Sequence, residues 1–258
     1  MKIREIIDRI TGKETPVIEP PPKVTVTQKI GVVRSLHPEH YSDVDDPAFW
    51  EICRHCFDYT LLPVDNLWSL YCAVQYICRR DIPGDLIECG VFLGGSLQLI
   101  AETLAAAEKT SRDERSRKIW AYDTFGGFVR RSDSDTTFAG DVICDYQTPN
   151  FRHETEANLF SVPYRDRIHI VEGDVTETMK TRKPDRVSLL RLDTDSYDTT
   201  LAELQILYPR LSVGGVLIID DYGYCKGARQ AVEEYFADPA KALLFMRSDS
   251  FCRLAVKI

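Results

Sequence analysis

From residue 85 onward, short apolar runs alternate with longer stretches whose apolar residues recur every three or four positions. The runs predict buried β-strands at residues 86–89, 119–122, 168–171, 187–192 and 216–219. The longer stretches predict amphipathic helices at residues 97–107, 201–211 and 228–236. Strands that alternate with helices form βαβ units, so we expect an α/β fold around a parallel sheet.

The two ends of the chain differ from this pattern. Residues 243–246 and 251–256 read as strands, and the segment between them is too short for a crossover helix, so the last strand should run antiparallel. Residues 46–80 have helical spacing and should cap the core. Residues 1–45 should form an arm, with a short amphipathic helix at 1–12 and a proline-rich linker at 15–23, and residues 46–258 one domain.

Charge and composition narrow the class of partner. The net charge is −8 over 258 residues, so no basic face is expected for nucleic acid or an anionic membrane, and the substrate should be small. The chain shows neither a signal-peptide core nor an apolar run that could cross a bilayer, which predicts a cytoplasmic protein. The amphipathic helix at residues 1–12 should dock on a partner, and we expect a homo-oligomer, a dimer or larger.

The eight cysteines are scattered and should be reduced thiols. Cys53 and Cys56 have the spacing of a zinc knuckle, but no second pair follows at ligand spacing. We interpret them as two helix residues, of which one faces inward.

The first predicted strand ends in Glu88 and runs through a glycine turn into a helix. Gly90, Gly94, Gly95 and Ser96 allow a tight turn whose helix start offers free N–H groups to an anionic ligand. Their spacing matches neither the dinucleotide nor the phosphate-loop motif. Glu88 would repel a pyrophosphate but attract an ammonium group, which favours S-adenosylmethionine over NAD.

Acidic residues also follow the next two strands. Asp123 should accept hydrogen bonds from both ribose hydroxyls, and Asp174 is a candidate for the exocyclic amine of adenine. The alternative for either residue is that it caps the following helix.

The fourth and fifth strands run into DTDSYD and DDYG. Asp193, Asp220 and Asp221 should therefore meet at one edge of the sheet, where their repulsion calls for a cation such as Mg²⁺. Asp198 is placed instead in the first turn of a helix. A metal would lower the pKa of an acceptor hydroxyl, and Asp195 would take its proton during attack on the sulfonium methyl group.

The segments DLIECGVFLGGS (85–96), YDTFGGF (122–128), LRLDTDSYDT (190–199) and LYPRLSVGGVLIIDDYG (207–223) resemble the TylF/MycF family of macrocin-type O-methyltransferases. The resemblance spans residues 60–236 and implies a class I S-adenosylmethionine-dependent methyltransferase with a Rossmann-like sheet, an antiparallel last strand and an N-terminal helical cap. It implies that Asp193, Asp220 and Asp221 bind Mg²⁺, that Asp195 is the base, and that the acceptor is a sugar hydroxyl on a glycosylated natural product.

Other functions remain open at this point. A catechol-type or other small-molecule O-methyltransferase would use the same metal chemistry, and a non-catalytic cofactor-binding assembly protein could keep the fold. An NAD-linked oxidoreductase is disfavoured by Glu88 and by the glycine spacing. The long polar segment at residues 128–154 is either a lid that contacts the acceptor or a surface loop.

Overall fold

The computed structural model describes residues 21–258 except 31–32, 111–115, 129–131, 144–145 and 148–149. The helix predicted at residues 1–12 and most of the proline-rich linker lie outside the described residues. Among the described residues, no helix combines the length and apolar character needed to cross a membrane.

The core of the molecule is a seven-stranded sheet in the order β5-β2-β1-β6-β7-β9-β8. Five strands are parallel: β1 (Asp85–Cys89), β2 (Ile119–Asp123), β5 (Ile168–Glu172), β6 (Val187–Leu192) and β7 (Leu211–Ile219). The last strand, β9 (Arg253–Val256), runs antiparallel between β7 and β8 (Met246–Arg247). The predicted α/β sheet with an antiparallel last strand is confirmed.

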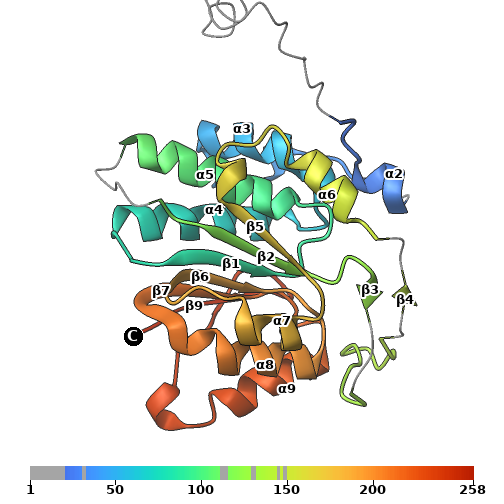
Figure 1. Ribbon diagram of the computed structural model, residues 1–258, viewed down its shortest axis with the longest axis vertical. Coiled ribbons are helices and arrows are strands. Elements are labelled where there is room, and N and C mark those ends of the chain that lie inside the picture. Colours follow the sequence, from blue (N-terminus) through green and yellow to red (C-terminus); the bar gives the residue numbers. More distant parts are fainter. Residues whose placement is uncertain (1–20, 31–32, 111–115, 129–131, 144–145, 148–149) are drawn as a thin grey trace, which may run out of the picture.

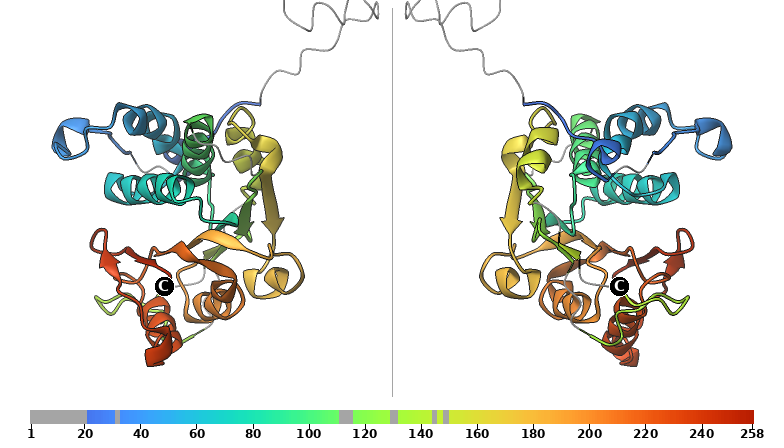
Figure 2. Two further views of the ribbon diagram at one scale, coloured as in Figure 1. Left: turned by 90° about the vertical axis from the view of Figure 1, so that its left-hand side faces the viewer. Right: turned by 90° about the vertical axis from the view of Figure 1, so that its right-hand side faces the viewer.

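Helices cover both faces of the sheet (Figure 1). One layer contains α3 (Pro47–Cys56), α4 (Val64–Arg79), α5 (Gly95–Thr110) and α6 (Arg152–Asn158), and the other contains α7 (Val175–Thr181), α8 (Tyr197–Ile206) and α9 (Lys226–Tyr235). The two side views in Figure 2 show the same two layers on either side of the strands. Consecutive strand residues such as Leu189 and Leu190 belong to opposite cores, which explains why the central strands are apolar at most positions.

The predicted helical segment at residues 46–80 forms the cap. Asp46 accepts hydrogen bonds from the backbone N–H groups of Ala48 and Phe49 and so begins α3. The segment is not one continuous helix, because a 3₁₀ turn (Phe57–Tyr59) and an extended link separate α3 from α4. Cys53 and Cys56 are both buried in α3, so the expectation that only one faces inward is wrong.

Two predicted boundaries also need correction. The helix expected at residues 201–211 begins at Tyr197 and ends at Ile206, and strand β7 already starts at Leu211. The early part of β7 was missed because the apolar run that predicts the strand begins only at Val216. The backbones of Gly214 and Gly215 exchange hydrogen bonds with Lys257 at the end of the chain, which extends the strand. Short elements β3 (Gly127–Phe128) and β4 (Tyr146–Gln147) pair within the segment predicted as a long loop.

Candidate active site

Strands β6 and β7 end side by side and deliver a cluster of carboxylates to one edge of the sheet. The backbone N–H of Asp220 donates to the carbonyl of Leu192 at 2.9 Å, which aligns the two strand ends. Asp193, Asp220 and Asp221 each bring one carboxylate oxygen to within 4.8 Å of the others. The structure therefore brings together the three acids that the sequence singled out.

This cluster has the character of a cation site. Burial raises the pKa of Asp220 to about 8, with the charge of Asp193 as the next contribution. Burial raises the pKa of Asp221 far above its usual range, and the negative charge of Asp195 adds to the shift. One oxygen of Asp221 is buried and has no hydrogen-bond partner in the part of the chain that the structure describes. A hard divalent cation takes oxygen ligands, so it would both neutralise these crowded carboxylates and pair with the buried oxygen of Asp221.

Asp195 lies against the same cluster. Its carboxyl group shares a hydrogen bond with Asp221, and its backbone has φ +62°, a left-handed conformation that is uncommon for residues other than glycine. Such strain is found at functional sites where surrounding contacts enforce it. Asp198 is exposed in the first turn of α8, outside the cluster, while Ser196 caps that helix.

Two buried acids hold the loop that carries Asp193 and Asp195. Asp135 accepts a hydrogen bond from the backbone N–H of Tyr197 at 2.9 Å, although it comes from the distant segment 128–154. Glu203 on α8 accepts from the Thr194 hydroxyl at 3.1 Å, and burial raises its pKa to about 8. Neither role was predicted from the sequence. Asp135 is one of several aspartates in a polar segment, and no local pattern distinguishes it from the others.

Arg191 is the central charged residue that sequence reasoning missed. Its side chain is 2% exposed, and its Nη1 donates to Glu88 at 2.5 Å and to Asp193 at 2.9 Å. Its Nη2 lies 3.0 Å from Asp220 in an ion pair. The register of β1 and β6 places Glu88 directly beside Arg191. An arginine inside the mostly apolar run Val187–Leu192 was the available signal, because a buried charge requires partners.

We expect Arg191→Met to destabilise the protein by about 3–5 kcal/mol, the usual cost of removing one partner from a buried ion pair. Glu88 would be left as a buried carboxylate without its cation. Urea unfolding measures the effect, and Arg186→Met is the matched control because Arg186 is exposed. Equal unfolding free energies for the two variants would show that the buried network does not stabilise the fold.

Asn66 links the helical cap to the carboxylates. It is buried in the first turn of α4, and its amide nitrogen lies 3.5 Å from Asp220 Oδ1. Its own amide oxygen is buried without a hydrogen-bond partner among the described residues. The signal for Asn66 was a polar side chain on the helix face that also carries Leu70 and Ile77, a position where an apolar residue is usual.

The predicted cofactor side lies at the end of β1. Glu88 is fully buried, and burial raises its pKa to about 7 against the opposing charge of Arg191. Ser96 hydrogen-bonds to the same carboxyl group. Gly90 has φ +83°, and a Cβ atom there would lie 1.8 Å from the carbonyl oxygen of Asp193, so only glycine fits between the two strand ends.

The other two glycines of the turn contact protein. A Cβ atom at Gly95 would lie 2.6 Å from the carbonyl oxygen of Cys56, so this glycine lets α5 approach the helical cap. Gly94 has φ +84° and faces the side chains of Thr155 and Leu159. Packing thus leaves no room for a side chain at either position, and only their backbone can serve a ligand.

Asp123 and Asp174 have different local partners. Asp123 accepts hydrogen bonds from the N–H groups of Val91, Phe92 and Phe125 at 2.7, 3.0 and 2.7 Å, which ties the glycine turn to the end of β2. Asp174 accepts from the N–H of Thr176 at 2.9 Å and caps α7. Of the two, Asp123 is the one that touches the glycine turn.

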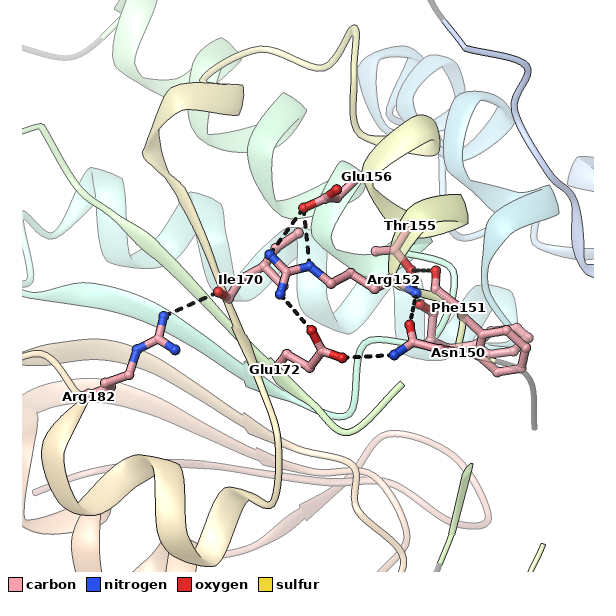
Figure 3. Close-up of polar contacts among 9 residues, drawn as sticks. Asn150, Phe151, Arg152, Thr155, Glu156, Ile170, Glu172 and Arg182 are labelled. Carbon is pink, nitrogen blue, oxygen red and sulfur yellow. Dashed lines mark hydrogen bonds and ion pairs between the residues drawn. The ribbon is translucent and has the colours of Figure 1, made fainter. Parts of the chain in front are cut away.

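Helix α6 supports the glycine turn from outside. The Thr155 hydroxyl donates to the carbonyl of Phe92 at 2.6 Å, and the Asn158 amide donates to that of Leu93 at 2.9 Å. Figure 3 shows Arg152 and Asn150 both reaching Glu172 at the end of β5, at 2.7 and 2.8 Å. The last part of the predicted polar loop is therefore a helix that holds the turn in place.

Comparison with known proteins agrees with this architecture. The family model for macrocin-O-methyltransferase (TylF) matches residues 49–243. Demethyldecarbamoylnovobiocin O-methyltransferase from Streptomyces niveus is 30% identical over 212 residues, covering 78% of each chain. The 8-demethyl-8-(2,3-dimethoxy-alpha-L-rhamnosyl)-tetracenomycin-C 4'-O-methyltransferase from Streptomyces olivaceus is 29% identical over 190 residues, covering 69% of this chain and 67% of the relative. The structure of the O-methyltransferase NovP has a TM-score of 0.65 at 24% identity and covers 77% of this chain and 82% of its own.

The sheet order, the glycine turn after β1 and the acidic strand ends define a class I S-adenosylmethionine-dependent methyltransferase fold. Within that class, the chain belongs to the macrocin O-methyltransferase (TylF) family. It is accordingly an S-adenosylmethionine-dependent O-methyltransferase. The resemblance stated from the sequence is confirmed.

Proposed function

We propose that the protein is a Mg²⁺-dependent methyltransferase acting on a hydroxyl of a sugar that belongs to a glycosylated natural product. The observation that carries the proposal is the convergence of Asp193, Asp220 and Asp221 beside Asp195 at the edge of a methyltransferase sheet. A sugar acceptor is supported by the Streptomyces olivaceus relative, whose name describes 4'-O-methylation of a rhamnosyl compound.

On this proposal the site residues divide into two groups. Asp193, Asp220 and Asp221 would hold the metal, and Asp195 would be the general base. The residues assigned to S-adenosylmethionine lie at the ends of β1, β2 and β5: Glu88, Gly90, Gly94, Gly95, Ser96, Asp123 and Asp174.

In the reaction, the acceptor oxygen must lose one proton and gain one methyl group. When bound, Mg²⁺ lowers the pKa of a hydroxyl that it contacts. Asp195 would accept the hydroxyl proton as the new C–O bond forms, and S-adenosylmethionine, when bound, would supply the methyl group and be left as the neutral thioether. Arg191 holds Asp193 and Asp220 in position through its two ion pairs, and Asn66 contacts Asp220 from the cap. Holding these groups in place before the reaction increases its rate, because the reacting groups are already oriented.

Calorimetry and a methyl-transfer assay test this function together. S-adenosylmethionine should bind and NAD should not, and a labelled methyl group should reach a sugar hydroxyl only when Mg²⁺ is present. Absence of S-adenosylmethionine binding would overturn the proposal. Methylation of catechol in preference to every sugar tested would replace the sugar acceptor with a catechol-type one.

A further inference from the structure

The side chain of Asn66 is buried where the helical cap meets the ends of β6 and β7. It is 6% exposed and lies in the first turn of α4, a helix that packs against both strands. Leu67 and Leu70 of the same helix are also buried. Burying an amide among apolar side chains is costly unless the amide has polar partners. Its presence at this position therefore points to a partner that a leucine could not serve.

The two ends of this amide are poorly satisfied within the chain. The nitrogen lies 3.5 Å from Asp220 Oδ1, which is long for a hydrogen bond. The oxygen is buried and has no hydrogen-bond partner among the described residues. Buried polar atoms normally have a partner, so this oxygen is free to bind a group that is not part of the chain.

Asp220 has a stronger partner than Asn66 in the same place. Arg191 Nη2 lies 3.0 Å from Asp220 Oδ1 and carries a positive charge. The amide nitrogen of Asn66 is neutral and more distant, so its donation to Asp220 adds little. Donation to Asp220 alone is therefore a weak reason for an amide at position 66.

A cation at the carboxylate cluster would give the amide oxygen a partner. The two ends of an asparagine amide have nearly the same shape, so a half-turn of the group exchanges oxygen and nitrogen. The oxygen would then lie 3.5 Å from Asp220 Oδ1, where the nitrogen lies now. Two oxygens bound to one Mg²⁺ at about 2.1 Å are about 3.0 Å apart in neighbouring positions and about 4.2 Å apart in opposite positions. The separation falls between these values, so both side chains can reach one cation.

An amide oxygen also suits the charge of the cluster. Asp193, Asp220 and Asp221 already bring three carboxylates to within 4.8 Å of one another. A neutral carbonyl oxygen is a ligand of the kind that Mg²⁺ takes, and it adds no further repulsion. With no cation bound, the nitrogen end faces Asp220 instead, which keeps two oxygens from repelling each other.

We propose that the side-chain amide oxygen of Asn66 is a fourth protein ligand of the cation, beside the three carboxylates. This inference rests on the proposed function and deepens it. The three carboxylates come from the ends of β6 and β7, whereas Asn66 comes from the cap. Cation binding would therefore fasten α4 over the active site.

Calorimetry with Mg²⁺, in the absence of S-adenosylmethionine and acceptor, tests the ligand without requiring activity. Asn66→Leu should bind Mg²⁺ about tenfold more weakly than the wild type. Gln75→Leu is the matched control and should bind as the wild type does, because Gln75 is a partly exposed residue of α4 that hydrogen-bonds to Arg79. Asn66→Asp keeps an oxygen but loses the N–H donor, so it should bind Mg²⁺ at least as tightly as the wild type.

Pulsed EPR with Mn²⁺ in place of Mg²⁺ identifies the bound atom directly. Protein labelled with ¹³C at the side-chain carbonyl of asparagine should show a ¹³C hyperfine coupling to the bound Mn²⁺. The same labelling of Asn66→Leu should remove the coupling, which excludes the other asparagines as its source. If Asn66→Leu fails to fold, the presence or absence of the coupling in the wild-type protein decides the outcome.

The results separate this inference from the proposed function. Equal Mg²⁺ affinity of Asn66→Leu and the wild type, binding by Asn66→Asp as weak as that of Asn66→Leu, or absence of the ¹³C coupling overturns the inference, while the proposed function stands. If the coupling is present but no sugar is methylated, Asn66 remains a ligand and the proposed function fails. If the wild-type protein binds neither Mg²⁺ nor Mn²⁺, the inference fails together with the Mg²⁺ dependence.

Discussion

Asp195→Asn should lower kcat by about 10² to 10⁴-fold, the usual contribution of a general base. The acceptor hydroxyl must lose its proton as the methyl group is transferred, and an amide cannot accept it. Asparagine is nearly the same size as aspartate and tolerates the left-handed backbone found at position 195, so the fold should be kept. The measurement is single-turnover methyl transfer from labelled S-adenosylmethionine to the best sugar acceptor.

Asp198→Asn is the control for this experiment, because Asp198 lies three residues later, exposed and outside the cluster. It should retain wild-type turnover. Binding of S-adenosylmethionine by Asp195→Asn should also match the wild type. Full turnover by Asp195→Asn would show that another group takes the proton, and the base would have to be sought elsewhere at the sheet edge.

Asp221→Asn should raise the Mg²⁺ concentration that gives half-maximal turnover by at least about 100-fold. Even the loss of an outer partner of a metal ligand lowers metal affinity by about 10- to 100-fold. The buried oxygen of Asp221 that lacks a hydrogen-bond partner among the described residues is the atom best placed to coordinate a cation. Chelation with EDTA should abolish turnover of the wild-type protein, and added Mg²⁺ should restore it. A titration of initial rate against Mg²⁺ concentration measures both effects.

Thermal unfolding provides a reading of metal binding that does not depend on activity. Saturating Mg²⁺ at about 100 times its Kd should stabilise the wild-type protein by about 2.7 kcal/mol and should not stabilise Asp221→Asn at the same concentration. Asp185→Asn, which changes an exposed aspartate, should respond to Mg²⁺ as the wild type does. If EDTA leaves turnover unchanged, the carboxylate cluster is not a metal site.

Much of the sheet could be predicted because both of its faces are covered. Strands such as Val187–Leu192 are buried at every position, so they appear in the sequence as short runs that are mostly apolar. The acids that follow them mark the strand ends, and parallel strands bring those ends to one edge. The start of β7 was missed because its pairing depends on Lys257, which is distant in sequence.

The candidate site was predicted only where it follows strand ends. Asp193, Asp220 and Asp221 belong to that group, and the structure brings them within reach of one another. Arg191 and Asn66 come from a strand interior and from the cap, and their partners are set by register and by helix packing. Asp135 reaches the loop of Asp195 from a segment about sixty residues away, which no local pattern encodes.

The sequence by itself determined the five parallel strands, the helices that correspond to α5, α8 and α9, the glycine turn after β1 and the supply of acids at neighbouring strand ends. These features follow from local periodicity and from the places where apolar runs stop. Only the tertiary structure decided which charges neutralise one another. Glu88 meets Arg191 through strand register, and Asn66 meets Asp220 through packing of the cap on the sheet. Such contacts join residues far apart in the chain, and the energy that selects them comes from burial of the whole assembly.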